Sequence, residues 1–234
     1  MAGSLLKDIV EGIEGAAIMA AAFITPFLNS RRARWGATDE EVNKTLPGDD
    51  LVPNSKGGYT HAVTIRASTA RVWPWLVQLG QGRGGFYSYD LLENIVRCNI
   101  HSADRIIPEL QNLEVGDRIL IYPSGQGYTV DSIAPQRMLV LLERVDTQSG
   151  KTFKLTRKMP EKYLNQSWVL FLEKIDRSTT RLISRSRNDW NNSLVNTVVF
   201  GIFGPITLVM DRKMLLGIKK RAEASVRRRK ADAA

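Results

Sequence analysis

The sequence predicts an α+β fold of the helix-grip type, in which a curved antiparallel sheet wraps around a long C-terminal helix and two short helices cover one end. The first observation is a series of short segments in which apolar and polar residues alternate between turn-forming residues, a pattern typical of antiparallel strands. The second is the element order: one strand, two short helices, several strands and a long amphipathic segment. A bent sheet that grips one helix tends to leave a large apolar cavity between them.

Composition indicates one folded domain with appendages. The chain has 234 residues, of which 43% are hydrophobic, enough for a substantial core. We expect a helix-grip domain at residues 59–226, preceded by an apolar helix with a basic cluster at 1–34 and an irregular arm at 35–58, and followed by a basic tail at 227–234. The net charge of +9 is concentrated in part at the chain ends. A single cysteine, Cys98, cannot form an internal disulfide, which favours a reducing, cytoplasmic location.

The N-terminal segment contains an apolar run at residues 16–28. The run is about 13 residues long, whereas a membrane-spanning helix needs roughly 20. Acidic residues precede the run and arginines follow it, the reverse of a secretory signal, and Pro26 would disturb its end. We expect a helix that docks on the domain or lies at a membrane surface. A true span is the alternative, with the arginines of 31–34 on the cytoplasmic side.

Residues 35–58 are expected to form an irregular arm, in which Thr38 opens a short segment that resembles a capped helix. The first strand covers residues 59–66, and we expect His61 in it to lie at the surface or at an edge. The later strand segments are residues 118–122, 128–133, 138–145, 167–175 and 180–188. Residues 151–166, which are basic, are predicted to form a long hairpin excursion.

The central stretch, residues 73–109, carries most of the aromatic residues that we expect near the cavity. Its first helix ends at the glycine-rich turn 80–85, and Ser88 is placed to cap a second short helix. The turn matches G-x-G-x-x-G, a motif of phosphate-binding loops. Such loops follow a strand and open a helix, whereas this turn follows a helix and no Lys-Ser/Thr pair comes after it. We therefore interpret the turn as a tight corner between two helices.

Residues 194–229 are predicted to form the long C-terminal helix. The first half is an apolar run that Pro205 and two glycines interrupt, and it is too short to span a bilayer. The second half places Met210 and Met214 on an apolar face and basic residues on the outer face. Methionines on such a face either fill a core or pack against a variable apolar ligand.

Four segments, at residues 67–79, 80–93, 100–117 and 208–223, carry a resemblance to a known family. Together with the element order, they resemble the SRPBCC superfamily, the START-like, birch-pollen-allergen-like helix-grip group that includes polyketide cyclases and lipid-transfer domains. The match extends over residues 59–223 and is strongest to a subgroup of mostly uncharacterised bacterial proteins. The resemblance implies a cavity for a hydrophobic small molecule, and it brings no family-wide set of catalytic residues.

The expected cavity wall combines aromatic and methionine side chains with a few polar groups at the entrance. The candidate ligand-binding residues are Trp75, Gln78, Arg83, Phe86, Tyr87, Tyr89, Trp168, Arg185, Met210 and Met214. Arg83 has an alternative role, pairing with Asp90 or Glu93 to hold the corner. Arg185 shares a strand face with Arg187, and the two are either solvated or form a carboxylate clamp inside the pocket, where they would need a partner.

Enzyme chemistry has three weak candidates: His101, Asp104 and Glu93. A histidine near carboxylates can act as a general base, although the same residues also form helix caps and salt bridges. No Cys/His cluster has metal-ligand spacing and no G-x-S-x-G motif is present, so we expect no metal and no cofactor. The aromatics are not interleaved with the basic runs, which argues against nucleic acid as a partner.

The sequence therefore predicts a protein that carries or senses a hydrophobic or amphipathic small molecule, such as a lipid, polyketide or isoprenoid. A polyketide cyclase- or dehydratase-like enzyme that uses the same cavity is the alternative. Residues 9–34 and the basic tail are expected to make peripheral contact with an anionic membrane.

Overall fold

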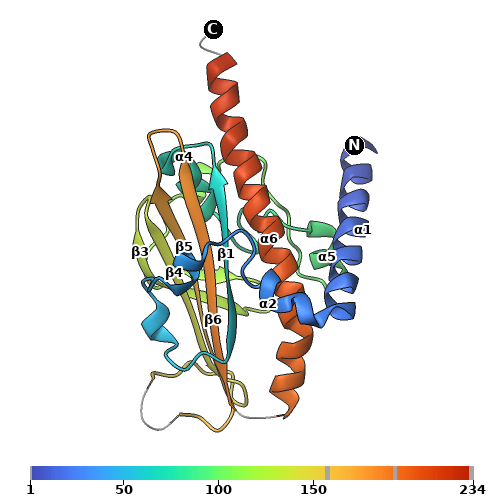
Figure 1. Cartoon of the computed structure of the whole chain (residues 1–234), viewed down its shortest axis with the longest axis vertical. Coiled ribbons are helices and arrows are strands. Elements are labelled where there is room, and N and C mark those ends of the chain that lie inside the picture. Colours follow the sequence, from blue (N-terminus) through green and yellow to red (C-terminus); the bar gives the residue numbers. More distant parts are fainter. Residues whose placement is uncertain (1, 156–158, 192–193, 232–234) are drawn as a thin grey trace.

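The computed structural model describes residues 2–155, 159–191 and 194–231. A curved antiparallel sheet wraps around one side of a long C-terminal helix, and an N-terminal helix lies on the other side of that helix (Figure 1). The described sheet has six strands in the order β1-β6-β5-β4-β3-β2. The strands are β1 (Gly57–Ile65), β2 (Arg118–Leu120), β3 (Gly127–Ala134), β4 (Met138–Asp146), β5 (Tyr163–Lys174) and β6 (Thr180–Trp190). The predicted helix-grip fold is confirmed.

Strand β5 differs most from its predicted extent. It begins at Tyr163, four residues before the predicted start at 167, because Leu164, Asn165 and Gln166 pair with the end of β6. The expected hairpin excursion is correspondingly shorter, and its residues 156–158 lie outside the described part of the chain.

The described chain has six α-helices and three short 3-10 helices. The α-helices are α1 (Ala2–Ile24), α2 (Asn29–Arg32), α3 (Asp39–Asn43), α4 (Thr69–Val77), α5 (Asp90–Ile95) and α6 (Leu194–Ala231). The 3-10 helices are η1 (Pro26–Leu28), η2 (Asp49–Leu51) and η3 (Pro108–Leu110). The capped helix predicted at Thr38 is present, since the Thr38 and Glu41 side chains form a reciprocal capping box. Ser88 does not cap α5, whose N-cap is Tyr89; the Ser88 hydroxyl instead donates to Glu93, 2.6 Å away.

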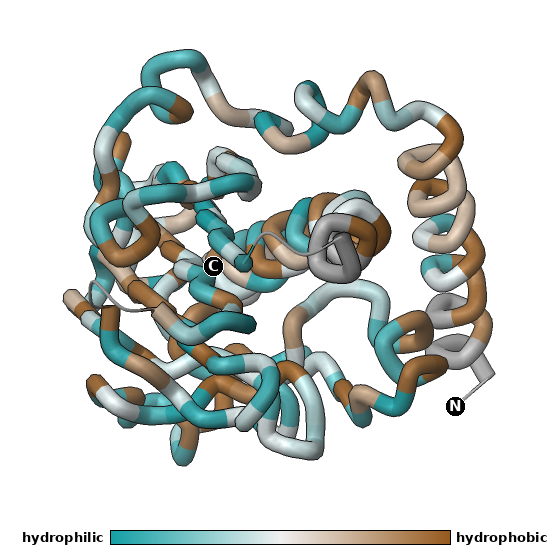
Figure 2. Tube along the Cα trace, turned by 90° about the horizontal axis from the view of Figure 1, so that it is seen from below, coloured by the Kyte–Doolittle hydropathy of each residue, from teal (hydrophilic) through white to brown (hydrophobic). Residues whose placement is uncertain are grey.

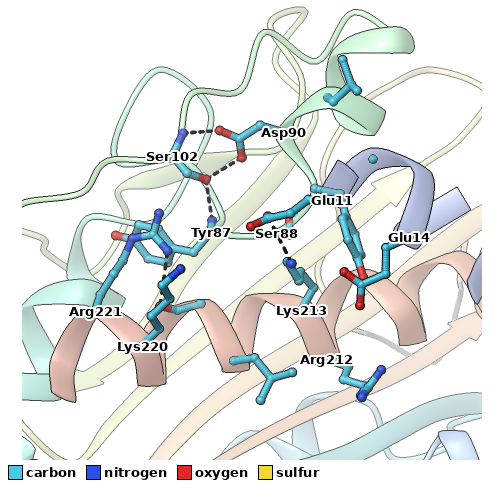
Figure 3. Close-up of a pocket in the computed structure, with 15 residues that line it drawn as sticks. Glu11, Glu14, Tyr87, Ser88, Asp90, Ser102, Arg212, Lys213, Lys220 and Arg221 are labelled. Atoms are coloured by element: carbon cyan, nitrogen blue, oxygen red, sulfur yellow. Dashed lines mark hydrogen bonds and ion pairs between the residues drawn. The ribbon is translucent and has the colours of Figure 1, made fainter. Parts of the chain in front are cut away.

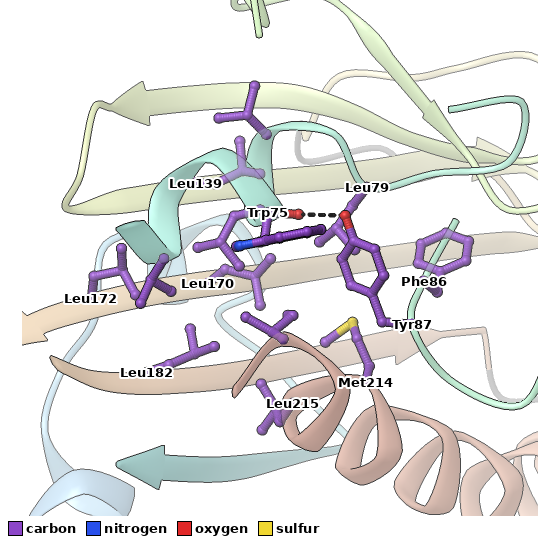
Figure 4. Close-up of a cluster of buried hydrophobic side chains, with 14 of the residues drawn as sticks. Trp75, Leu79, Phe86, Tyr87, Leu139, Leu170, Leu172, Leu182, Met214 and Leu215 are labelled. Carbon is purple, nitrogen blue, oxygen red and sulfur yellow. Dashed lines mark hydrogen bonds between the residues drawn. The ribbon is translucent and has the colours of Figure 1, made fainter. Parts of the chain in front are cut away.

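The main hydrophobic core lies between the inner face of the sheet, α4 and the middle of α6 (Figure 4). Leu139, Leu170 and Leu182 from three neighbouring strands are fully buried there, and Leu215 from α6 packs against them. Each such side chain stabilises the fold by about 1.5–3 kcal/mol relative to an exposed position. This core fixes α6 to the sheet near α4.

The arm at residues 35–58 covers the outer face of the sheet. Leu46 from the arm packs with Val140, Val169 and Ile183, which point away from α6. Gly48 has φ +90°, and a Cβ there would lie 2.7 Å from Val140 Cγ1, so the arm approaches the sheet more closely than another residue would permit. The arm therefore contributes a second, smaller core.

Helix α1 docks on α5 and α6 through small residues. A Cβ on Gly12 would lie 2.6 Å from Leu91 Cδ2, and one on Gly15 would lie 2.8 Å from Leu92 Cδ1. Among the described helices, none alone is long and apolar enough to cross a membrane, and one pair, Ile9–Ile24 with Pro26–Arg32, meets that test only together and is bent by 97°.

Candidate ligand-binding cavity

An apolar cavity of about 490 Å³ lies between the sheet, α5, α1 and the first half of α6. Its size falls within the range of pockets that hold drug-sized ligands. Four of the ten candidate ligand-binding residues line it: Phe86, Trp168, Met210 and Met214. Phe86 precedes α5, Trp168 comes from β5, and the two methionines project from adjacent turns of α6. The predicted hollow between sheet and helix is thus present at the α5 end.

Trp75 and Tyr87 belong to the main core rather than to this cavity. Their rings meet edge to face with centroids 5.7 Å apart, and the Tyr87 hydroxyl donates to the Trp75 carbonyl at 3.1 Å (Figure 4). Burial raises the pKa of Tyr87 above its ordinary value. Both aromatics therefore hold α4 against the segment before α5.

Gln78 and Arg83 satisfy backbone groups at the glycine corner and do not line the cavity. The Arg83 guanidinium donates to the carbonyls of Val77 at 3.0 Å and Leu79 at 3.1 Å, which the end of α4 leaves without helical partners. The Gln78 side-chain oxygen accepts from the Ile107 N–H at 3.0 Å. Burial lowers the pKa of Arg83.

The alternative pairing of Arg83 with Asp90 or Glu93 is not formed. Asp90 instead accepts from the Ser102 backbone and hydroxyl, both at 2.6 Å. Glu93 accepts from Ser88. The corner is therefore held by guanidinium-to-carbonyl hydrogen bonds.

Arg185 lies on the outer face of the sheet, away from the cavity. It forms an ion pair with Asp49 at 2.7 Å and donates to the carbonyls of Glu41 and Lys44 in the arm. Only 4% of Arg185 is exposed, so these partners offset the cost of burying its charge. Neither of the two roles considered for it is present, because Arg185 is not solvated and the carboxylate that it binds is Asp49 of the arm, outside the cavity.

A buried polar network borders the cavity on the sheet side. Asp211 of α6 accepts from the Tyr59 hydroxyl at 2.9 Å and the Ser184 hydroxyl at 2.7 Å, and its other oxygen lies 2.7 Å from His61 Nδ1. Trp168 Nε1 extends the network by donating to Ser184 at 2.9 Å. Burial, with the neighbouring Asp211 carboxylate, raises the pKa of Tyr59 well above its ordinary value, so its hydroxyl stays a donor.

His61 is fully buried, so the predicted surface position is wrong, although its strand β1 does form an edge of the sheet. Its Nε2 faces the Arg32 carbonyl at 2.8 Å, while Nδ1 faces Asp211. Both ring nitrogens therefore face oxygen atoms of the protein. His61 thereby joins α2, β1 and α6. The sequence contained evidence for this burial, because side chains alternate between the two faces of a strand and His61 therefore shares a face with the core residues Val63 and Ile65.

Glu93 is the one enzyme candidate that lines the cavity. Its Oε1 accepts from Ser88, and its buried Oε2 has no hydrogen-bond partner among the described residues. Burial raises the pKa of Glu93 to about 7. Tyr128 also lines the cavity. Burial raises the pKa of Tyr128, so its hydroxyl stays protonated.

His101 and Asp104 are exposed and lie outside the cavity. His101 Nε2 is 3.2 Å from the Asn99 side-chain oxygen. The three enzyme candidates are therefore not brought together. Within the described ranges, no group of three or more His, Cys, Asp or Glu residues is placed to hold a metal ion.

A second, polar cavity of about 250 Å³ lies between α1, α6 and residues 87–91 (Figure 3). Tyr87 and Tyr89 line this cavity, not the apolar one. Two of its cations are engaged by the protein: Lys213 pairs with Glu11 at 3.1 Å and lies 4.8 Å from the Tyr89 ring centre, and Arg221 lies 4.6 Å from the Tyr87 ring centre. The Lys213–Glu11 pair ties α6 to α1.

No family model and no curated protein matches the chain. Solved structures that are similar include a conserved protein from Geobacillus kaustophilus, with 14% identity over 72% of this chain and 95% of that chain and a TM-score of 0.38. A protein from Arthrobacter aurescens has 14% identity over 71% and 86%, with a TM-score of 0.38. CalU16 from Micromonospora echinospora has 11% identity over 71% and 84%, with a TM-score of 0.30. At these values the likenesses assign no function to this chain.

Proposed function

We propose that the protein binds a hydrophobic or amphipathic small molecule, of the lipid, polyketide or isoprenoid class, in the apolar cavity. The observation that carries the proposal is a cavity of about 490 Å³ with mainly apolar walls, into which Tyr128 and Glu93 also face, the latter with a buried Oε2 that has no hydrogen-bond partner in the described chain. The resemblance of residues 59–223 to the SRPBCC superfamily supports the same role.

Burial of ligand carbon supplies the driving force. A ligand that buries about 300 Å² of apolar surface gains roughly 7 kcal/mol at 25 cal/mol per Å², before the entropy lost on binding is subtracted. Glu93 and Tyr128 then orient the polar end of the ligand. A protonated Glu93 donates to a carbonyl or ether oxygen, whereas the ionised form accepts from a hydroxyl.

Native mass spectrometry of the purified protein tests occupancy directly, since a co-purifying apolar molecule at stoichiometric level identifies the ligand class. A fluorescent long-chain fatty acid is the probe for affinity. Replacing Met210 by Trp fills the cavity from α6, and we expect probe affinity to fall roughly tenfold or more. Val198→Trp is the matched control, because Val198 lies on the same helix, is 52% exposed and lines neither cavity. Equal affinity of the two variants would rule out this cavity as the site.

A cyclase- or dehydratase-like enzyme is the second candidate, favoured by one observation. A carboxyl group with a pKa of about 7 in an apolar cavity is suited to proton transfer near neutral pH. Glu93→Gln separates the two roles by turnover, because binding of the probe is kept in either case. An enzyme converts the co-purified molecule and loses this activity in Glu93→Gln, whereas a carrier shows no conversion with either form. His101→Ala leaves both unchanged, because His101 is exposed.

A further inference from the structure

The side of α1 that faces away from α6 is apolar. Figure 2 shows hydrophobic residues along this side of the helix. Large side chains recur there at helical spacing, with exposed fractions of 63% for Leu6, 57% for Val10, 66% for Ile13 and 77% for Ile24. We call these four residues the outer face of α1. Phe27, in η1 beyond the bend that follows α1, is 75% exposed as well.

The outer face is not needed to attach α1 to the domain. The attached side combines small residues, Gly12, Gly15 and the fully buried Ala22, with the larger Ile18 and Met19, which pack inward. A helix that serves only to complete a core turns its large apolar residues inward. Here further large apolar residues lie on the opposite side, where they are available to a partner.

A second group of exposed apolar residues lies at the rim of the cavity. Ile95 at the end of α5 is 69% exposed, and the adjacent Val96 is 60% exposed. Ile95 and Val96 both line the cavity, as does Phe203 of α6, which is 57% exposed. Leu91, at the contact between α5 and Gly12 of α1, is 39% exposed. The cavity rim thus presents apolar side chains to the outside in addition to those of the outer face.

The charges around this surface favour an anionic partner. Arg31 follows the outer face and Arg97 follows Val96, and both are exposed. The whole chain carries a net charge of +9. A helix with large apolar residues on one side and flanking arginines has the properties of helices that lie in the interface of anionic bilayers.

We propose that the outer face of α1, with Ile95, Val96 and Phe203, inserts into the interfacial region of an anionic phospholipid bilayer. Arg31 and Arg97 then meet lipid phosphates, and the cavity rim meets the acyl chains. The proposal goes beyond ligand binding and does not depend on it, because the bilayer contacts exposed side chains whether or not the cavity is filled.

Vesicle flotation of the full chain tests the proposal. The wild type floats with vesicles of phosphatidylcholine mixed with phosphatidylglycerol, and floats less with phosphatidylcholine alone. The Ile13→Ser/Ile24→Ser double variant loses affinity for the mixed vesicles by roughly tenfold or more. The matched control is Ile175→Ser, since Ile175 is 56% exposed and lies after β5, far along the chain from α1.

Arg31→Glu/Arg97→Glu provides a second test that leaves the apolar face intact. Its binding to the mixed vesicles falls, and added salt weakens wild-type binding more than that of the variant. Thermal melting confirms that each variant is folded. The proposal is overturned if the wild type fails to float with mixed vesicles, or if the Ile13/Ile24 variant floats like the Ile175 control. If the wild type does not bind vesicles but forms a dimer, and the Ile13/Ile24 variant is a monomer, the outer face binds a second copy of the chain instead.

Discussion

Glu93 is a carboxylic acid held among apolar side chains, and its protonation is coupled to folding. Burial raises its pKa from the ordinary 4.5 to about 7. Between these pH values the folded state holds a proton that the unfolded state has released, so stability is full below about pH 4.5 and is lost as pH rises to about 7.

We therefore expect Glu93→Gln to be more stable than the wild type at about pH 8, by on the order of 1–3 kcal/mol, and to lose this advantage at about pH 4.5. Urea unfolding at both pH values measures the difference. Glu109→Gln, at an exposed glutamate, is the control. If Glu93→Gln and the control follow the same pH dependence, the carboxyl of Glu93 is not held in an apolar environment.

His61 and Asp211 form a buried pair, in which each side chain supplies the hydrogen-bond partner of the other. Asp211→Ala leaves His61, Tyr59 and Ser184 with buried groups that have lost their acceptor, which costs roughly 3–5 kcal/mol. His61→Ala costs a similar amount, and the double variant costs clearly less than the sum. A double-mutant cycle by urea unfolding measures this coupling. Additive losses would show that the two side chains act independently.

The sequence indicated part of this site and could not indicate the rest. Strand alternation places His61 inward with Val63, and helical spacing places Met210 and Met214 on one face. The partner of His61 is 150 residues away in the chain, and no local pattern predicts that pairing. Similarly, the sequence could not predict that the Arg83 guanidinium donates to backbone carbonyls, because those carbonyls come within reach only in the folded chain.

At the scale of elements, the arm shows how one buried arginine holds a segment to the sheet. Replacing Arg185 by Met removes the partner of Asp49 and of two arm carbonyls. We expect a loss of roughly 3 kcal/mol and faster amide exchange at residues 41–51, with the inner core unchanged. Hydrogen exchange followed by mass spectrometry measures the effect. Arg177→Met, at an exposed position, should leave exchange in the arm at the wild-type rate.

Elements were easier to predict from the sequence than their packing. The capping box at Thr38 and Glu41 is local, and it identified α3. The arm was expected to be irregular and separate because its turns and short helix carry little periodicity. Its contact with the outer face of the sheet depends on Leu46 meeting Val140 and Ile183, which are distant in sequence.

At the scale of the molecule, the order of elements explains why an apolar cavity exists but not where it lies. The helix α6 has 38 residues and packs along one face of the sheet, and the side chains of the main core fill the space between them near α4. The space near α5 is closed by α1, which contributes Met19 to the cavity wall. A segment that the sequence placed outside the domain therefore completes the candidate site.

This position of α1 leads to a prediction about the whole molecule. Gly12→Leu places a side chain where a Cβ alone would meet Leu91 Cδ2 at 2.6 Å, so Leu91 must turn aside or α1 must move away from α5. Leucine raises intrinsic helix propensity by up to about 1 kcal/mol over glycine, so an unattached α1 would be stabilised. We expect instead a loss of roughly 1–3 kcal/mol and faster release of the fatty-acid probe. Urea unfolding and stopped-flow fluorescence measure these two effects.

Gly201→Leu is the matched control, since the same change on α6 meets open space. It should gain stability from helix propensity and leave the probe release rate unchanged. If Gly12→Leu also gained stability and kept that rate, α1 would not be seated on α5 and would not form a wall of the cavity. A destabilised Gly12→Leu with faster release connects the N-terminal helix to the ligand site, because steric displacement opposes its helix propensity.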